Sequence, residues 1–465
     1  LAVWMLSAGG LSTPAFSCES DTLTHLSISE SDALDVEIRG GDCQRFLVNS
    51  SGPLRITVTE GEVNLILHVT RGATSTAYDS GLEGHWLETA LGEPGHGGGI
   101  RFAIEATGTP KLADKVRLSL QPLKPVLEEN MAMRRALDLT MESLAQLDGT
   151  RSLTAVTAGQ VAKIDQAADA WHRAGRPLEA AWLWLILSRA YQELGPDYEA
   201  ALAAVASGLA DLEPAAYPEH RLRLDMERGA LLLFAGDLGD AETVFEHTIA
   251  RASATADRGL RAELHIYLGL VHHTRDELIA AETNYLRAAD LLSGDSIPRL
   301  ESMVHNNLAG VYFLRGEPAP AFRHFDEAIA VASAAGDLQG EAHALMNAAT
   351  LHVDIGQFDR ALVRYERAKH DFESLSAEGD VALALRGIGA AYLNLGLPER
   401  AIEFLSLAIE RAEEVGDLMT VNGARLSLGK AYRMSGKPEI ALTEHERLLS
   451  DSLEQERTSD AARAR

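Results

Sequence analysis

The residues that come closest to a nucleophile are the two cysteines of the chain, Cys18 and Cys43. A Cys–His hydrolase needs a thiolate beside an imidazole, whereas both cysteines lie in or just before a strand-rich segment. If this segment is exported, a disulfide between them is the better interpretation, and it would stabilise the fold by roughly 3 kcal/mol. Two cysteines also exclude a cysteine-based zinc site of normal spacing.

The adjacent histidines His272 and His273 are the pattern that would suggest a metal site. Neighbouring residues of a helix point about 100° apart, so these two imidazoles cannot share one ion on a helix. His272 also occupies a position that other parts of the chain fill with tyrosine, which favours core packing. We interpret Glu413–Glu414 as a solvated face. We therefore expect no enzyme, metal or cofactor here, with a hydrolase in the strand-rich segment as the weaker alternative.

The charge of the chain restricts its partners. Its 68 acidic residues outnumber its 42 basic ones, which gives a formal net charge of −26. Nucleic-acid binding requires basic patches, and anionic membranes attract basic surfaces, so neither partner is expected. After the N-terminal segment, no apolar run approaches the roughly 20 residues needed to span a bilayer.

The first seventeen residues, LAVWMLSAGGLSTPAFS, resemble the apolar region and cleavage site of a secretory signal. Because the basic N-terminal part is missing, we interpret residues 1–17 as a clipped signal peptide and expect a periplasmic or extracellular protein. Lipidation of Cys18 and a buried first strand in a cytoplasmic protein are the alternatives.

Residues 18–124 contain short stretches in which apolar and polar residues alternate, such as LRITVTE and IRFAIEA. Glycine and proline separate these stretches, for example at Gly40–Gly41 and Gly52–Pro53. Several short alternating segments with frequent turns predict an antiparallel β-sandwich.

From about Leu127 the apolar spacing becomes helical, and a repeat of 40 residues appears. Glycine recurs at one position of each repeat, and Asp276 takes its place once. An aromatic, His or Leu side chain stands four residues earlier, and alanine stands five residues later. The turn positions are Gly195, Gly236, Asp276, Gly316, Gly356, Gly396 and Gly436; the alanines are Ala200, Ala241, Ala281, Ala321, Ala361, Ala401 and Ala441.

Each position of this repeat has a physical reason. Glycine past a helix end adopts the left-handed conformation that other residues resist. Proline begins the next helix at Pro318, Pro398 and Pro438, where no N–H is needed. Alanine lets two antiparallel helices approach closely. A single helix pair cannot bury its apolar face, so neighbouring pairs must stack into a superhelix.

This pattern resembles the tetratricopeptide repeat, in a form of 40 rather than 34 residues. The resemblance implies about seven repeats in 175–465. The last residues then begin an eighth repeat, or else they form a frayed polar tail. Residues 125–174 are expected to form a helical linker or capping hairpin. The longer period implies longer helices or longer turns. The expected fold is thus a multi-domain chain: an N-terminal antiparallel β-sandwich followed by an all-α superhelix.

In this family the inner surface of the superhelix binds peptides or proteins. Carried onto this sequence, the resemblance implies a peptide-binding groove in which asparagine amides clamp a backbone and basic residues hold a carboxylate. The alternative is that these are ordinary solvated residues. They are Asn306, Asn307, Asn347, Arg386, Asn394, Lys430 and Arg433.

The order of an exported sandwich, a helical linker and 40-residue repeats resembles the N-terminal part of bacterial CHAT-domain proteins, a caspase-like family. LRITVTEGEVNLILHVTRG carries this likeness loosely. There the peptidase domain follows the repeats, so the resemblance implies the regulatory or recognition arm of a longer peptidase. The alternative is the periplasmic sensory segment of a transmembrane signalling enzyme such as a nucleotide cyclase.

Overall fold

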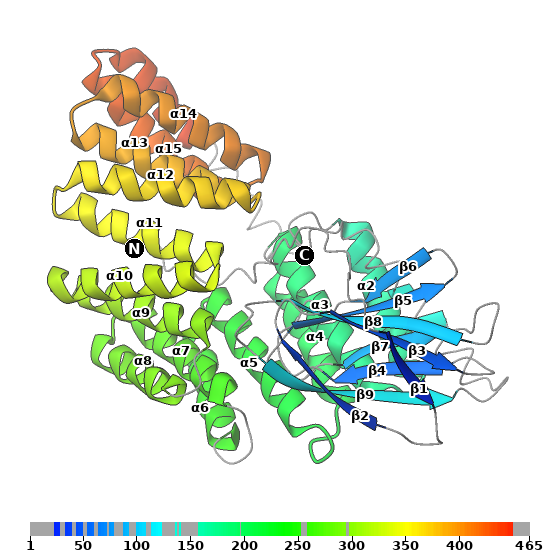
Figure 1. Cartoon of the computed structure of the whole chain (residues 1–465). Coiled ribbons are helices and arrows are strands. Elements are labelled where there is room, and N and C mark those ends of the chain that lie inside the picture. Colours follow the sequence, from blue (N-terminus) through cyan, green and yellow to red (C-terminus); the bar gives the residue numbers. More distant parts are fainter. Residues whose placement is uncertain are drawn as a thin grey trace. The chain divides into compact units, whose positions relative to one another are not determined.

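The computed structural model describes the strands between residues 23 and 122, residues 135, 136, 139 and 140, and residues 157–449 except 196, 253–257 and 294–296. The chain divides into two compact units, with the boundary between Val271 and His272 (Figure 1). The predicted signal peptide, Cys18 and the predicted Cys18–Cys43 disulfide lie outside the described residues, as does the chain after 449.

The first unit contains a five-stranded sheet in the order β1-β3-β8-β5-β6 and a four-stranded sheet in the order β2-β9-β4-β7. The strands are β1 Leu23–Ser27, β2 Ala33–Arg39, β3 Cys43–Asn49, β4 Leu54–Thr59, β5 Asn64–Arg71, β6 Thr74–Tyr78, β7 Leu87–Gly92, β8 Gly99–Thr107 and β9 Ala113–Pro122.

One strand pairing departs from the antiparallel arrangement expected from the sequence. β1 pairs in parallel with β3, with Leu23 opposite Arg45, whereas the remaining paired strands run antiparallel. The reason is the path of the chain. Between β1 and β3 it crosses to the other sheet, where β2 pairs with β9, and it returns in the original direction.

The same unit continues with helices α2 Ala158–Arg173, α3 Pro177–Leu194, α4 Tyr198–Asp211, α5 Pro218–Ala235, α6 Leu238–Ala252 and the part of α7 (Arg258–Thr274) up to the boundary. Thr157 begins α2 with a capping box, in which its side chain and that of Gln160 satisfy each other's backbone N–H groups. Trp171 is buried, and its Nε1 donates to Thr140 Oγ1 over 2.9 Å.

The second unit is built from helix pairs, which follow one another from α9 onward in Figure 1. Its helices are α8 Leu278–Leu292, α9 Pro298–Leu314, α10 Pro318–Ala335, α11 Leu338–Asp354, α12 Phe358–Ser374, α13 Glu378–Asn394, α14 Pro398–Glu414 and α15 Leu418–Met434; residues 438–449 are also helical.

Helix length explains the period of the repeat. Each of α11, α12, α13, α14 and α15 has 17 residues, and successive helices are separated by three residues. Two such helices and two such turns add up to the 40-residue step in the sequence. The helices thus supply most of each 40-residue step, and the turns between them are short.

The turns have the predicted left-handed geometry with one exception, Gly195, whose φ of 150° and ψ of 130° differ from the left-handed helical conformation. Gly396 has φ of 74°, and the N–H of Leu397 donates to the Tyr392 carbonyl over 3.0 Å, which closes the end of α13. Asp276 takes the glycine position with φ of 62°. Ser376, in the turn between α12 and α13, is a second non-glycine residue in this region, with φ of 55°.

The alanine positions are buried as predicted, with one correction. Ala281, Ala321, Ala361 and Ala401 are fully buried. In the first of these repeats, however, the buried residue is Ala201 and not the predicted Ala200. The turn at Gly195 has one more residue than that at Gly396, since α4 begins three residues after its glycine and α14 begins two after. The longer turn shifts the register of α4 by one.

The first helices of the repeats lie on the inner side of the second unit. α9 contacts α11, α11 contacts α13 and α13 contacts α15, whereas neighbouring second helices contact each other more sparsely in the described residues. A row of helix pairs that packs more closely along one side curves toward that side. The first helices therefore form the inner face on which the predicted groove residues were placed.

Among the described residues, every helix is too short or too polar to cross a bilayer.

Candidate functional site

All seven predicted groove residues lie on first helices. Their exposure separates them into two groups: the members on α9 and α11 and Arg386 of α13 are half-buried, and the remaining three are exposed. The half-buried group is Asn306, Asn307, Asn347 and Arg386, and the exposed group is Asn394, Lys430 and Arg433.

A hydrogen bond between two of the predicted asparagines joins neighbouring repeats. Asn347 Nδ2 of α11 donates to Asn306 Oδ1 of α9 over 2.9 Å. The sequence prediction placed Asn347 against Asn307, which is one full repeat away. The partner is the preceding residue because the contact depends on how α9 and α11 are rotated about their axes. The bonded pair retains the Asn306 donor nitrogen and the Asn347 acceptor oxygen for a ligand.

Arg386 of α13 is the most unusual residue of this face. Its guanidinium lies over Gly423 of α15, where a side chain would collide with Nη1. Among the described residues, no carboxylate is within ion-pair distance of it, although Asp417 is near enough to interact electrostatically. Burial lowers the pKa of Arg386, and Asp417 and Tyr365 oppose this effect. Within the described part of the chain, Arg386 thus holds a partly desolvated positive charge without a bonded counter-ion.

The surroundings of Arg386 are packed and polar. Tyr365 of α12 is buried, its ring lies against Gly387, and its hydroxyl is 3.0 Å from Thr350 Oγ1 of α11. Asp417 caps α15, since its Oδ1 accepts from the Thr420 N–H over 3.0 Å. Such packing holds the guanidinium in place, and a fixed guanidinium is suited to bind a carboxylate through two parallel hydrogen bonds.

The three exposed residues are not joined to this group. Within the part of the chain that the structure describes, no hydrogen bond links Asn394, Lys430 or Arg433 to Arg386 or to the asparagine pair. The assignment of these three residues to the groove therefore remains a prediction. The candidate site consists of the parts of α9, α11, α13 and α15 near Asn306, Asn347 and Arg386.

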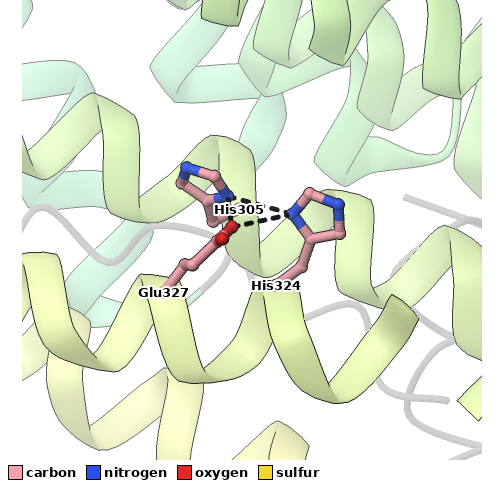
Figure 2. Close-up of side chains that lie close together, drawn as sticks. All are labelled: His305, His324 and Glu327. Carbon is pink, nitrogen blue, oxygen red and sulfur yellow. Dashed lines mark hydrogen bonds and ion pairs between the residues drawn. The ribbon is translucent and has the colours of Figure 1, made fainter. Parts of the chain in front are cut away.

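A second cluster was missed by the sequence reasoning. His305 of α9 faces His324 and Glu327 of α10, and the three side chains point toward one another (Figure 2). His305 Nδ1 lies 3.0 Å from His324 Nδ1 and 3.0 Å from Glu327 Oε2, and His324 Nδ1 lies 3.4 Å from the same oxygen. The sequence held part of the signal, because His305 and Glu327 are equally far from Gly316 and therefore lie at similar heights on α9 and α10. Whether their side chains meet depends on the rotation of the two helices.

In contrast to this cluster, the adjacent residues His272 and His273 do not converge on a common point. His272 Nδ1 lies 2.7 Å from Glu277 Oε2, whereas the ring of His273 packs against Tyr285 at a centroid distance of 6.4 Å. Burial lowers the pKa of His273, and the charge of Asp276 opposes this effect. The two rings thus lie in separate environments, which agrees with the expectation that adjacent residues of a helix point in different directions.

Comparison with known proteins matches part of the chain to one family. Residues 300–369 fit the family model described as tetratricopeptide repeat. This segment holds most of α9 and α12 and all of α10 and α11, and it includes Asn306, Asn347 and the cluster of Figure 2. A search of curated proteins found no match.

Several solved structures are similar to parts of this chain. The apo form of the quorum sensor NprR from B. thuringiensis is 10% identical, with a TM-score of 0.52, over 70% of this chain and 88% of that chain. A signal transduction ATPase with a tetratricopeptide repeat sensor from Pyrococcus horikoshii is 14% identical, with a TM-score of 0.47, over 70% and 54%. Rap protein complexed with competence and sporulation factor is 15% identical, with a TM-score of 0.42, over 64% and 78%. The chain thus spans about half of the ATPase, and the likeness to NprR concerns the fold of a helical repeat.

Proposed function

We propose that the chain is a non-catalytic scaffold that binds a protein or peptide along the first helices α9, α11, α13 and α15. The observation that carries the proposal is Arg386, a partly desolvated guanidinium on the inner face without a bonded carboxylate among the described residues. An acidic side chain or terminal carboxylate of the ligand would occupy this place. Support for the general mode of action comes from the helical-repeat fold, which is typical of proteins that bind other proteins.

The asparagine pair supplies the second contact. Because Asn347 Nδ2 already donates to Asn306 Oδ1, both amides are oriented and lose little side-chain entropy on binding. The remaining donor and acceptor fit the N–H and C=O groups of an extended peptide backbone. We infer that the backbone binds near the asparagines of α9 and α11 and that the acidic group points toward α13.

The test selects ligands for the whole chain from a random-peptide library that presents free C termini. We expect enrichment of peptides with an acidic residue or C-terminal carboxylate at a fixed position. Arg386→Ala should weaken the selected peptide at least tenfold, about 1.4 kcal/mol, whereas Arg400→Ala is the matched control. Arg400 is exposed on the second helix α14 and pairs with Glu403 at 3.2 Å.

A further variant separates the position of Arg386 from its charge. Gly423→Ala keeps the guanidinium but forces it to move, because a Cβ at residue 423 would collide with Nη1. We expect this variant to weaken the peptide as well. Selected peptides without acidic preference, or equal binding by the wild type, Arg386→Ala and Gly423→Ala, would overturn the assignment of this face.

We propose further that the two N-terminal sheets form a β-sandwich and that the chain is exported as the recognition arm of a longer CHAT-type peptidase. The resemblance of the sequence order supports this context, and the DNA that follows codon 465 tests it. A His and Cys peptidase segment there would agree with the proposal. An apolar 20-residue segment followed by a cyclase motif would favour the alternative, a sensory segment of a signalling enzyme.

Ligand sensing is the second candidate function, and the fold shared with the quorum sensor NprR favours it. A sensor must change conformation on binding, whereas a scaffold need not. Small-angle scattering of the chain with and without the selected peptide distinguishes the two. A change in the radius of gyration on binding supports sensing, and an unchanged profile supports the scaffold.

A further inference from the structure

We propose that His305, His324 and Glu327 form a binding site for a zinc-like divalent metal ion. The three side chains come from the two helices of one pair, α9 and α10, and they converge on a common point in Figure 2. His324 and Glu327 are three residues apart and therefore share one side of α10. His305 reaches them from α9. The site is distinct from the proposed ligand face at Arg386.

The distances between the three ligand atoms match a tetrahedral ion. Zn²⁺ binds imidazole nitrogen and carboxylate oxygen at about 2.0–2.2 Å, which places neighbouring ligand atoms of a tetrahedron about 3.3–3.6 Å apart. The observed separations are 3.0 Å, 3.0 Å and 3.4 Å. A shift of a few tenths of an ångström in two side chains would therefore complete the geometry. A tetrahedral ion lies to one side of the plane of three of its ligands, and from such a position an ion can bind all three atoms.

The types of ligand atom decide the class of metal. Two imidazole nitrogens and one carboxylate oxygen suit Zn²⁺ and neighbouring late transition metals such as Co²⁺, whereas Mg²⁺ and Ca²⁺ prefer oxygen ligands. Three protein ligands leave a fourth position for water or for a group of a partner. The side chain of Glu327 is 56% exposed, so an ion can enter from solvent.

The neighbouring side chains hold the ligands in place. The ring of Tyr312 stacks on that of His324 at a centroid distance of 5.3 Å and an angle of 8°. The Tyr312 hydroxyl donates to Glu282 Oε1 over 2.7 Å, and Arg315 binds the other oxygen of Glu282 over 2.7 Å. These contacts fix the ring plane of His324, which is the role that surrounding residues play around known metal sites. The nearby charges are mixed, since Glu282 is negative and Arg323 is positive.

The competing explanation is a hydrogen-bonded triad without metal. One proton on His305 Nδ1 can be donated to His324 or to Glu327 but not shared fully by both. At least one pair among the three atoms then has no proton between its members, so their lone pairs face each other unless a second proton is added. A bound cation satisfies all three atoms at once, so metal binding and a proton-sharing triad make different predictions.

The test uses the full chain stripped of metal with a chelator. Zn²⁺ binding is measured by competition with a chromophoric chelator, and Co²⁺ serves as a visible-absorption probe of tetrahedral coordination. Glu327→Gln is nearly isosteric and leaves the stacking of Tyr312 on His324 intact, and His324→Ala removes a ligand outright. Each variant should lower the affinity for Zn²⁺ by at least about tenfold, because even the loss of a residue that only supports a metal ligand has an effect of that size. Each should also abolish the Co²⁺ band and the rise in Tm on adding Zn²⁺.

Controls keep the result independent of folding and of other histidines. His370→Ala on α12 and Glu403→Gln on α14 alter exposed residues outside the cluster, and they should retain wild-type affinity. Circular dichroism without metal identifies any variant that fails to fold, in which case Glu327→Gln decides. Equal Zn²⁺ affinity for the wild type, Glu327→Gln and the controls, or no tetrahedral Co²⁺ band in the wild type, would overturn the metal site in favour of the triad.

Discussion

The side-chain nitrogen of Asn347 donates to Asn306 Oδ1 over 2.9 Å, which joins the first helices of two successive repeats. A neutral hydrogen bond of this kind contributes about 0.5–1.5 kcal/mol. We expect a double-mutant cycle of Asn306→Ala and Asn347→Ala to show a coupling energy of that size in urea unfolding of the chain. The matched cycle of Asn307→Ala with Asn347→Ala should show none, and coupling of equal size in both cycles would contradict the observed register.

Ser376 holds a left-handed conformation, with φ of 55°, in the turn between α12 and α13. A residue with a Cβ is strained there by about 1–2 kcal/mol, while glycine loses about 0.5–1 kcal/mol in added chain entropy. Ser376→Gly should therefore raise the free energy of unfolding by up to about 1.5 kcal/mol. Thermal unfolding measures this change.

Ser374 provides the control for the turn. It lies in the last turn of α12, where glycine destabilises a helix by about 0.5–1 kcal/mol. Ser374→Gly should therefore lower stability. If both serine variants shift the unfolding temperature in the same direction, strain at Ser376 is not the cause.

Gly389 of α13 allows close contact with α14. A Cβ at this position would lie 2.6 Å from Cγ of the fully buried Leu405. Gly389→Ala should lower stability by about 1–3 kcal/mol, as overpacking does in close-packed cores. Gly379 lies on the same helix, and a Cβ there would meet only Val415 Cγ2 at 3.9 Å. Gly379→Ala should therefore be neutral or stabilising by up to about 1 kcal/mol, and a similar loss in both variants would refute the packing argument.

His343 of α11 makes the stability of the fold depend on pH. Burial lowers its pKa to about 4, against an opposing effect of Asp337, and its ring packs edge-on against Phe372. Between about pH 6.5 and 4 the unfolded chain binds a proton that the folded chain does not, so stability falls as pH decreases through this window. The loss amounts to about 3 kcal/mol.

The measurement compares the wild type with His343→Leu by urea unfolding at several pH values. Relative to the wild type, the variant should gain stability as pH falls from 6.5 toward 4. Asp380→Asn provides a contrast of opposite sign. Burial and the charge of Asp417 raise the pKa of Asp380 to about 6, so its ionisation opposes folding and the variant should gain stability as pH rises through 6. Parallel pH profiles for all three proteins would contradict both assignments.

The position of the turn within each repeat could be predicted from the sequence because the determinants are local. A left-handed residue after a helix strongly favours glycine, and the recurrence of glycine every 40 residues indicates both the turns and the pair of helices between them. Even the exception at Asp276 was assigned to its turn by spacing alone, and its φ of 62° agrees. The buried alanines follow from the same register wherever the turn keeps its length.

The contacts between helices depended on the tertiary structure. One extra residue in the turn at Gly195 moved the buried position from Ala200 to Ala201. The rotation of α9 against α11 selected Asn306 over Asn307 as the partner of Asn347. The meeting of His305 with His324 and Glu327 follows from how α9 folds back on α10. Sequence spacing determines which face of a helix a residue occupies, but the crossing angle and rotation of two helices decide which atoms touch, and these depend on the packing of all neighbouring side chains together.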